Sequence, residues 1–181
     1  MVKKPSKMII LLACFLTSCS INYNESEDGS VKSEEIPDSI MENFKLVQIK
    51  DNKIHTEITS SLAEIYESQN KTLLFNVNFK EYSSSGDTIN TAGNVDEIVY
   101  FNDNENANLK GNLKFESKKE NIKITGNSLY WNKDDKIISS DINDSIKIIK
   151  DDGSKIEGYG FTANLKYSTF SFKKDVKGES K

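Results

Sequence analysis

The chain has no arginine, very little proline and almost no cysteine or histidine. All 24 basic residues are lysines, and the formal net charge is −4. Arginine provides the planar fork that contacts phosphate and guanine, so its absence in an acidic chain argues against nucleic-acid binding. The two cysteines, Cys14 and Cys19, lie near the N-terminus, and His55 is the single histidine. The sequence after Cys19 therefore excludes disulfides, cysteine metal sites and catalytic histidine pairs, and we predict no metal and no cofactor.

The sequence also lacks the motifs of common enzyme classes. It has no Gly-x-Ser-x-Gly, no P-loop and no dinucleotide-binding fingerprint. The acidic segments 102–106 and 132–135 have the composition of calcium loops, but the first lacks the loop glycine and the closing glutamate of an EF-hand. We interpret both segments as turns and predict that the protein is not an enzyme.

The first 18 residues have the pattern of a secretory signal. Lysines at positions 3, 4 and 7 precede a short apolar run over 8–16. Such a run would rise only about 14 Å as a helix, roughly half of a bilayer core. Leu16-Thr17-Ser18-Cys19 resembles a bacterial lipobox, which predicts cleavage after residue 18 and lipidation of Cys19. The alternative is an ordinary signal with a chance cysteine.

Residues 19–36 are polar and acidic and predict a disordered tether behind the lipidated Cys19. Acyl chains, at about 0.8 kcal/mol per buried methylene, would hold the protein stably at a membrane surface. The tether leads into one predicted domain over residues 37–173, and residues 174–181 predict a frayed polar tail.

The main body alternates apolar and polar residues. Leu73, Phe75, Val77 and Phe79 are spaced for one face of a strand, and we predict a strand over 73–82. Residues 39–50 fit either a short helix or an edge strand. Further strands are predicted over 54–58, 62–67, 89–93, 97–101, 108–116, 121–126, 128–131, 136–139, 145–150, 155–165 and 167–173.

Glycines recur at similar points of three such units, at positions 93, 126 and 158. This recurrence indicates a weak internal repeat of hairpin-like units that stack to bury their apolar faces. Glycines inside strands, Gly111 and Gly160 among them, favour bends that curl the sheet. The pattern predicts an all-β antiparallel sandwich or roll.

The order and spacing of several segments resemble the LptC family, the membrane-attached component of lipopolysaccharide export, over about residues 51–172. They are Ala63-Glu-Ile-Tyr66, Val77-Asn-Phe79 with Gly86, Leu109-Lys-Gly111-Asn-Leu113, Ser128-Leu-Tyr-Trp131 with 136–140, and Ile146-x-Ile148 with 156–161. The resemblance implies an antiparallel β-jellyroll folded like a half-open taco, with an apolar groove for lipid acyl chains.

The same resemblance implies partners on both sides. These are lipopolysaccharide or another glycolipid, the periplasmic jellyroll of an inner-membrane ABC transporter (LptB/F/G-like), an LptA-like bridge protein, and the membrane through the lipid anchor. Family members commonly carry an N-terminal transmembrane helix where this chain has a lipobox. We expect a periplasmic protein anchored to the inner membrane, although Ser20 after the cysteine is typical of outer-membrane sorting.

The expected lipid-binding residues are the apolar positions assigned to the inner face. They are Ile54, Ile58, Phe75, Val77, Phe79, Ile98, Tyr100, Leu113, Phe115, Ile122, Ile124, Leu129, Trp131, Ile146, Ile148 and Phe161. Periodicity alone favours a closed core, because most apolar faces are cores, whereas the resemblance favours a lipid-binding face. The alternative is therefore a surface-displayed lipoprotein with a closed β-sandwich that binds another protein.

An open roll leaves free strand edges, which a partner can extend by strand addition. The expected docking segments are the N-terminal edge near 54–58 and the C-terminal strands over 155–172. Gly158 and Gly160 would allow close approach of a partner there, or would only relieve a tight bend.

Overall fold

The structure, a computed structural model, describes residues 36–167 and 169–180. The predicted signal peptide, Cys19 and nearly all of the tether lie outside these residues. The strands are β1 Ser39–Lys50, β2 Lys53–Tyr66, β3 Lys71–Tyr82, β4 Ile89–Phe101, β5 Ala107–Ser117, β6 Ile122–Asn132, β7 Ile137–Ser139, β8 Ser145–Lys150, β9 Lys155–Tyr159, β10 Thr162–Asn164, β11 Thr169–Ser171 and β12 Lys174–Glu179. A 3-10 turn, Glu67–Gln69, follows β2, and no helix in the described ranges has the length and hydropathy to cross a membrane.

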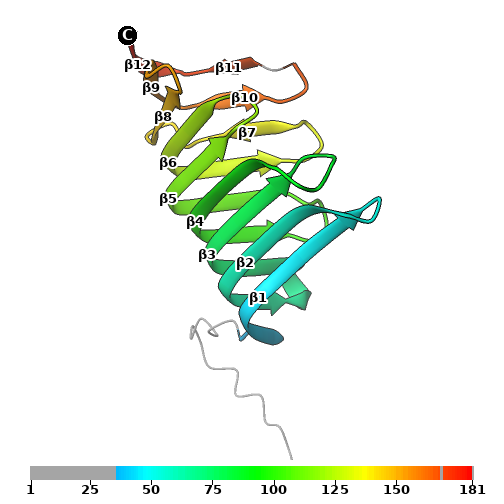
Figure 1. Cartoon of the computed structure of the whole chain (residues 1–181). Coiled ribbons are helices and arrows are strands. Elements are labelled where there is room, and N and C mark those ends of the chain that lie inside the picture. Colours follow the sequence, from blue (N-terminus) through cyan, green and yellow to red (C-terminus); the bar gives the residue numbers. More distant parts are fainter. Residues whose placement is uncertain (1–35, 168, 181) are drawn as a thin grey trace, which may run out of the picture. The chain divides into compact units, whose positions relative to one another are not determined.

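The twelve strands form one antiparallel sheet that forks after β6. Strands β1 to β6 pair in sequence order, as the ladder of ribbons in Figure 1 shows. The last residues of β6 pair with β7, while its first residues pair with β8. One branch then continues through β10 to β11, and the other through β9 to β12. The predicted all-β antiparallel architecture is confirmed.

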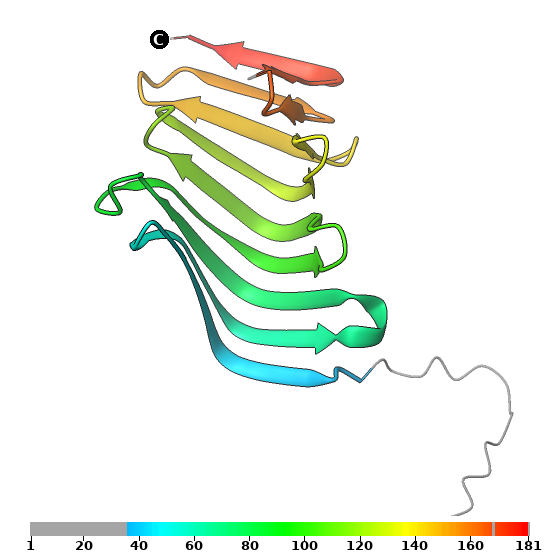
Figure 2. The same cartoon turned by 90° about the vertical axis from the view of Figure 1, so that its right-hand side faces the viewer.

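The long strands bend partway along their length, so the sheet folds back on itself (Figure 2). The half that continues into β7, β10 and β11 is called the first limb here. The half that continues into β8, β9 and β12 is called the second limb. Buried apolar residues of both limbs form one core, which consists of Ala63, Leu74, Val77, Val95, Leu113, Leu129, Ile146, Ile148 and Phe161. The sheet therefore encloses its own inner face.

Asparagines set the bend. Asn43, Asn76 and Asn112 lie inside β1, β3 and β5 with φ values of 52°, 51° and 44°, and Gly111 has φ 80°. Asparagine and glycine tolerate this left-handed conformation better than other residues. The registers between β4, β5 and β6 shift beside Gly111 and Asn112, as expected of bulges that bend a sheet. We call this line of bulges the seam.

Polar side chains satisfy the seam where the backbone ladder is interrupted. The Asn76 Nδ2 donates to Ser61 Oγ at 2.9 Å, and Ser61 Oγ donates to the Phe75 carbonyl oxygen at 3.1 Å. The Asn112 Nδ2 donates to Asp96 Oδ2 at 2.7 Å. The Ser61 bond satisfies a backbone carbonyl, and the other two bonds join side chains of neighbouring strands across the seam.

The seam reverses which residues of a strand face inward. Leu74 and Val77 are both in the core although they are three residues apart, because Asn76 between them is left-handed. Phe75 instead stands opposite Glu97. The prediction that positions 73, 75, 77 and 79 share one face is therefore wrong for 73 and 75, since a bulge breaks the period of two.

Other boundaries also differ from prediction. Residues 39–50, left open between helix and strand, form β1, and 54–58 is part of β2, which pairs on both sides with β1 and β3. The predicted strand over 155–165 is divided into β9 and β10, with Gly160 at φ 62° between them. Most of the predicted frayed tail forms β12, which pairs with β9.

The outer face of the second limb carries ion pairs across neighbouring strands. Glu57 bonds to Lys45 at 2.8 Å on β1 and to Lys80 at 3.2 Å on β3. Hydrogen bonds from these two lysines lower the pKa of Glu57. Glu116 and Lys123 continue the pattern at 3.5 Å between β5 and β6. The charges keep this face in water, which leaves the inner face as the apolar one.

Candidate lipid-binding face

The inner face consists of rows of side chains that run across the strands. In the second limb, the register aligns Leu46, Ile58, Phe79, Gly93, Phe115, Ile124, Ile148 and Ile156. In the first limb it aligns Met41, Ala63, Leu74, Ile98, Leu109 and Leu129. Directly opposite residues of paired strands project from the same face. Each limb therefore presents a nearly unbroken apolar row.

Some of the predicted lipid-binding residues are fully buried. Ile146 is 0% exposed, and Val77 and Leu113 are 1% exposed. The predicted residues that belong to this buried group are Val77, Leu113, Leu129, Ile146, Ile148 and Phe161. They pack against one another next to the seam and form the spine of the core.

A second group of predicted residues is only half-buried. These side chains pack on the spine with part of their surface open to solvent, and they are Ile58, Ile98, Phe115, Ile122 and Ile124. Phe79 is also half-buried and contacts Phe115, with ring centroids 5.0 Å apart. Half-buried apolar rows on both limbs can still gain from covering by an apolar guest.

Gly93 makes room for the aromatic pair in this group. A Cβ atom at position 93 would lie 2.5 Å from the Lys114 carbonyl oxygen, 2.5 Å from Phe79 Cε1 and 2.6 Å from Phe115 Cδ1. The two rings therefore close over the bare backbone of β4. The glycine that the sequence marked as a repeat position is here a packing requirement of the inner face.

Tyr100 and Trp131 lie on a row nearer the end of the first limb. The register aligns Tyr100 with Ala107, Trp131 and Ile138. Burial raises the pKa of the Tyr100 hydroxyl. Both predicted residues are half-buried. Their hydroxyl and indole N–H groups make this end of the inner face more polar than its centre.

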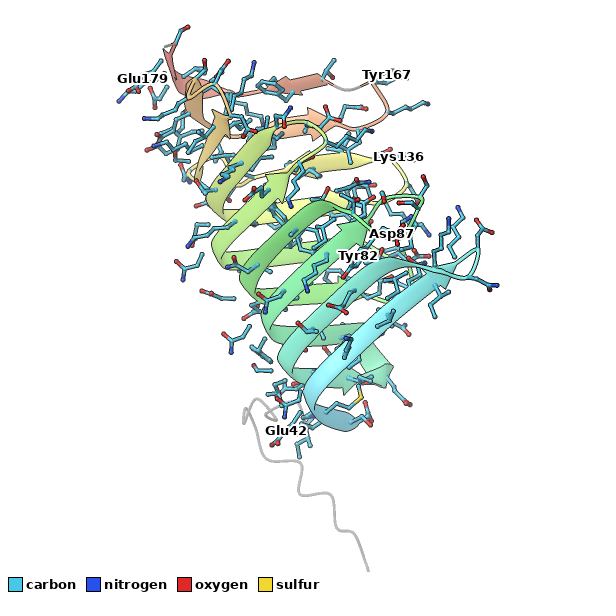
Figure 3. The ribbon with its side chains drawn as sticks, viewed as in Figure 1. Glu42, Tyr82, Asp87, Lys136, Tyr167 and Glu179 are labelled. Carbon is cyan, nitrogen blue, oxygen red and sulfur yellow. The ribbon has the colours of Figure 1, made fainter. Side chains whose placement is uncertain are left out.

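The structure places two predicted residues outside these groups. Phe75 on β3 lies directly opposite Glu97 on β4 and is not part of the core. Ile54 lies beside the turn between β1 and β2 and is 39% exposed. Figure 3 labels Tyr82, the last residue of β3, and Asp87 in the connection between β3 and β4.

The apolar rows extend onto β1, the end strand on the N-terminal side, where they are exposed. Strand β1 pairs with β2 on one side only. Its inward residues Met41 and Leu46 are 36% and 49% exposed, because no further strand covers them among the described residues. Ile49 continues this surface and is 66% exposed. The chain therefore presents an apolar, strand-shaped end.

The C-terminal end is partly closed by three phenylalanines. Phe161 contacts Phe170 and Phe172 with ring centroids 6.3 and 5.4 Å apart. Phe170 on β11 remains 54% exposed. Side chains of both branches thus meet across this end. The last strand of the first limb, β11, pairs with β10 only and has no neighbouring strand on its other side among the described residues.

Gly158 and Gly160, predicted for partner docking, are not at a free edge. Strand β9 pairs with β8 on one side and β12 on the other. A Cβ at Gly158 would lie 2.9 Å from the Phe172 ring, and one at Gly160 would lie 2.8 Å from Ile142 Cδ1. Both glycines are buried. They accommodate the chain's own side chains, and the strands that pair on one side only within the described residues are β1, β11 and β12.

The sequence analysis expected bends at strand glycines such as Gly111, but it missed the left-handed asparagines, Asn43, Asn76 and Asn112, that complete the seam. The dipeptide Gly-Asn occurs at 93–94, 111–112 and 126–127, once in each of β4, β5 and β6. This recurrence is a signal that could have located the bend. No group of three or more potential metal ligands occurs among residues 36–167 and 169–180.

A folded antiparallel sheet with an apolar inner face and open end strands defines the class of β-jellyrolls. A solved structure of this class is LptH, described as the LptA-homologous periplasmic component of the lipopolysaccharide transport device of Pseudomonas aeruginosa. It matches with a TM-score of 0.55 and 12% identity over 70% of this chain and 94% of LptH. A search of curated proteins found no match.

The family model described as "Lipopolysaccharide-assembly, LptC-related" matches residues 8–181. The chain therefore belongs to the LptC family of lipopolysaccharide assembly. The resemblance noted in the sequence is confirmed.

Proposed function

We propose that the protein is a periplasmic component of a lipopolysaccharide or glycolipid export system that carries acyl chains on its inner face. A chain of about a dozen carbons leaves roughly 10 kcal/mol of hydrophobic free energy to be recovered from water. A carrier must cover such a chain and still release it. The half-buried rows of both limbs support this proposal, because they are apolar, continuous across the strands and incompletely covered.

The buried and half-buried groups have different tasks in this proposal. The spine around Val77, Leu113 and Ile146 holds the limbs together whether or not lipid is bound. The half-buried residues, Ile58, Phe79, Ile98, Phe115, Ile122 and Ile124, form the contact surface for acyl chains. The energy to move the lipid comes from an ATPase elsewhere in the system.

The neighbours in the export system would attach at the two ends of the sheet. We assign β1 to the periplasmic jellyroll of an inner-membrane ABC transporter (LptB/F/G-like) and the β11 and β12 end to an LptA-like bridge protein. The solved structure with this fold is itself described as a periplasmic transport component. Lipidated Cys19 would anchor the chain to a membrane, for which we favour the inner one.

Photo-crosslinking at neighbouring positions of β5 tests the lipid proposal. A benzophenone amino acid at Phe115, on the inner face, should form adducts with envelope lipid in cells. The same group at Lys114, the exposed next residue of that strand, should form few. Adducts would be detected by mass spectrometry of the purified protein. A benzophenone at Phe79, the ring partner of Phe115, serves as a second inner-face position. Equal labelling at Phe115 and Lys114, or no lipid adduct at either Phe115 or Phe79, would instead support a closed sandwich.

Substitution on β1 tests docking at the N-terminal end. Leu46→Lys places a charge on the exposed apolar row, and we expect at least a tenfold loss of copurification with the transporter. Glu42→Lys also introduces a lysine on β1, at the end marked in Figure 3, and should leave copurification unchanged. Thermal unfolding of both variants would verify that the fold is intact. If Leu46→Lys retained the transporter fully, β1 would not be the docking strand.

A further inference from the structure

A pocket separate from the apolar rows lies where the loop joining β4 to β5 meets the turn joining β6 to β7. Its volume is about 380 Å³, near the lower end of the roughly 300–1,000 Å³ of ligand pockets. Lys136 in Figure 3 marks the β6–β7 turn. Phe101 and Tyr130 provide aromatic surface in this pocket, and the register places Tyr130 between Asn108 and Ser139 on the outer face of the first limb.

The remaining lining is polar and uncharged. It consists of four asparagines, at positions 104, 106, 108 and 132, and the hydroxyl of Ser139. Within the part of the chain that the structure describes, no lysine, aspartate or glutamate lines the pocket. This composition does not favour an anion, which needs a cation, or an acyl chain, which needs an apolar wall.

Hydrogen bonds hold the asparagines of the two loops in place. The Asn104 Oδ1 accepts from the Asn106 backbone N–H at 3.0 Å, and the Asn106 Oδ1 accepts from the Lys133 backbone N–H at 2.9 Å. The Asn132 Oδ1 accepts from the Asp135 backbone N–H at 2.9 Å. Lys133 Nζ also pairs with a Glu105 carboxylate oxygen, which links the two loops. The amide oxygens of Asn104, Asn106 and Asn132 are thus engaged, which fixes the orientation of their Nδ2 donors.

We propose that this pocket binds a saccharide. Sugar rings present C–H faces that pack on aromatic side chains and hydroxyls that exchange hydrogen bonds with amides and hydroxyls. Aromatic walls, amide donors held by the backbone and the absence of charge together match that chemistry. The saccharide could be the headgroup of a glycolipid or a soluble envelope glycan, because both present the same rings and hydroxyls.

Isothermal titration calorimetry of the full chain measures binding without a label. The chain would be titrated with two probes: the oligosaccharide freed of acyl chains from the cells' own envelope glycolipid, and a maltooligosaccharide. We expect a saturable heat of binding. Saturation with the first probe alone identifies a headgroup site, and saturation with both or with maltooligosaccharide alone identifies a general glycan site.

Asn108→Ala is the informative variant, because no side-chain hydrogen bond of Asn108 holds the loops, and it should weaken saccharide binding at least tenfold. Asn78→Ala, on the exposed part of β3 away from the pocket, is the matched control and should bind like the parent chain. Absence of saturation with either probe at millimolar concentration, or equal binding by Asn108→Ala, would overturn the proposal. Neither probe has acyl chains, so this result is independent of the lipid proposal.

Discussion

Replacing Ile146 by alanine is expected to lower the free energy of unfolding by about 3–4 kcal/mol, as for other large-to-small changes in a core. Ile146 is 0% exposed and lies over Gly126, where a Cβ would be 2.2 Å from the Ile146 Cδ1. The side chain therefore fills the space that glycine leaves on β6. Alanine would open a cavity in the spine, because the surrounding strands relax only partly. Urea unfolding followed by circular dichroism measures the loss.

Ile149→Ala is the matched control for this prediction. Ile149 belongs to the same strand, β8, but pairs with Lys123 and Lys155 in the outer register. Its truncation should cost about 1 kcal/mol or less, since a partly exposed side chain loses less buried area. Similar losses for the two variants would show that the limbs are not held together at Ile146.

The second large effect is expected from Gly93→Ala, which should destabilise the fold by about 3 kcal/mol as an overpacked site. The added methyl group would lie 2.5 Å from the Lys114 carbonyl oxygen, which is backbone and cannot rotate away. It would also separate Phe79 from Phe115, whose rings now meet at 5.0 Å. We expect both a lower urea midpoint and weaker lipid crosslinking at Phe115.

Gly178→Ala provides the comparison. Gly178 aligns with Ile156 at the far end of the same row, and an added Cβ there would be 3.9 Å from the nearest atom, the Lys155 carbonyl oxygen. The change in unfolding free energy should stay within about 0.5 kcal/mol, as at ordinary surface sites. If Gly93→Ala were equally harmless, the close packing over β4 would not be required for the fold.

The choice of inner-face residues shows where sequence reasoning succeeds and fails. Period-two alternation predicted Val77, Phe79, Leu113 and Phe115 correctly as inward, because each lies within a regular stretch of strand. It failed for Phe75, since the left-handed Asn76 shifts the alternation by one residue. A bulge depends on the neighbouring strand as much as on its own sequence, so alternation within one strand cannot reveal it.

The expectation of an open edge at Gly158 and Gly160 is wrong for a similar reason. Glycines allow another backbone to come close, which is why Gly158 and Gly160 were expected at an open edge. Phe172 and β12 cover them instead. The segment that forms β12 has Val176 as its one large apolar residue and shows no apolar period. It becomes a strand only because β9 offers a free edge to pair with.

The amino-acid sequence by itself determined that this chain is all-β, has no cysteine after residue 19, and resembles the LptC family, because alternation and composition are local properties. The tertiary structure alone decided where the sheet bends, which apolar residues are spine and which remain half-open, and which strands end the sheet. These features arise from pairing between distant segments. Their energies depend on contacts that no single stretch of sequence contains.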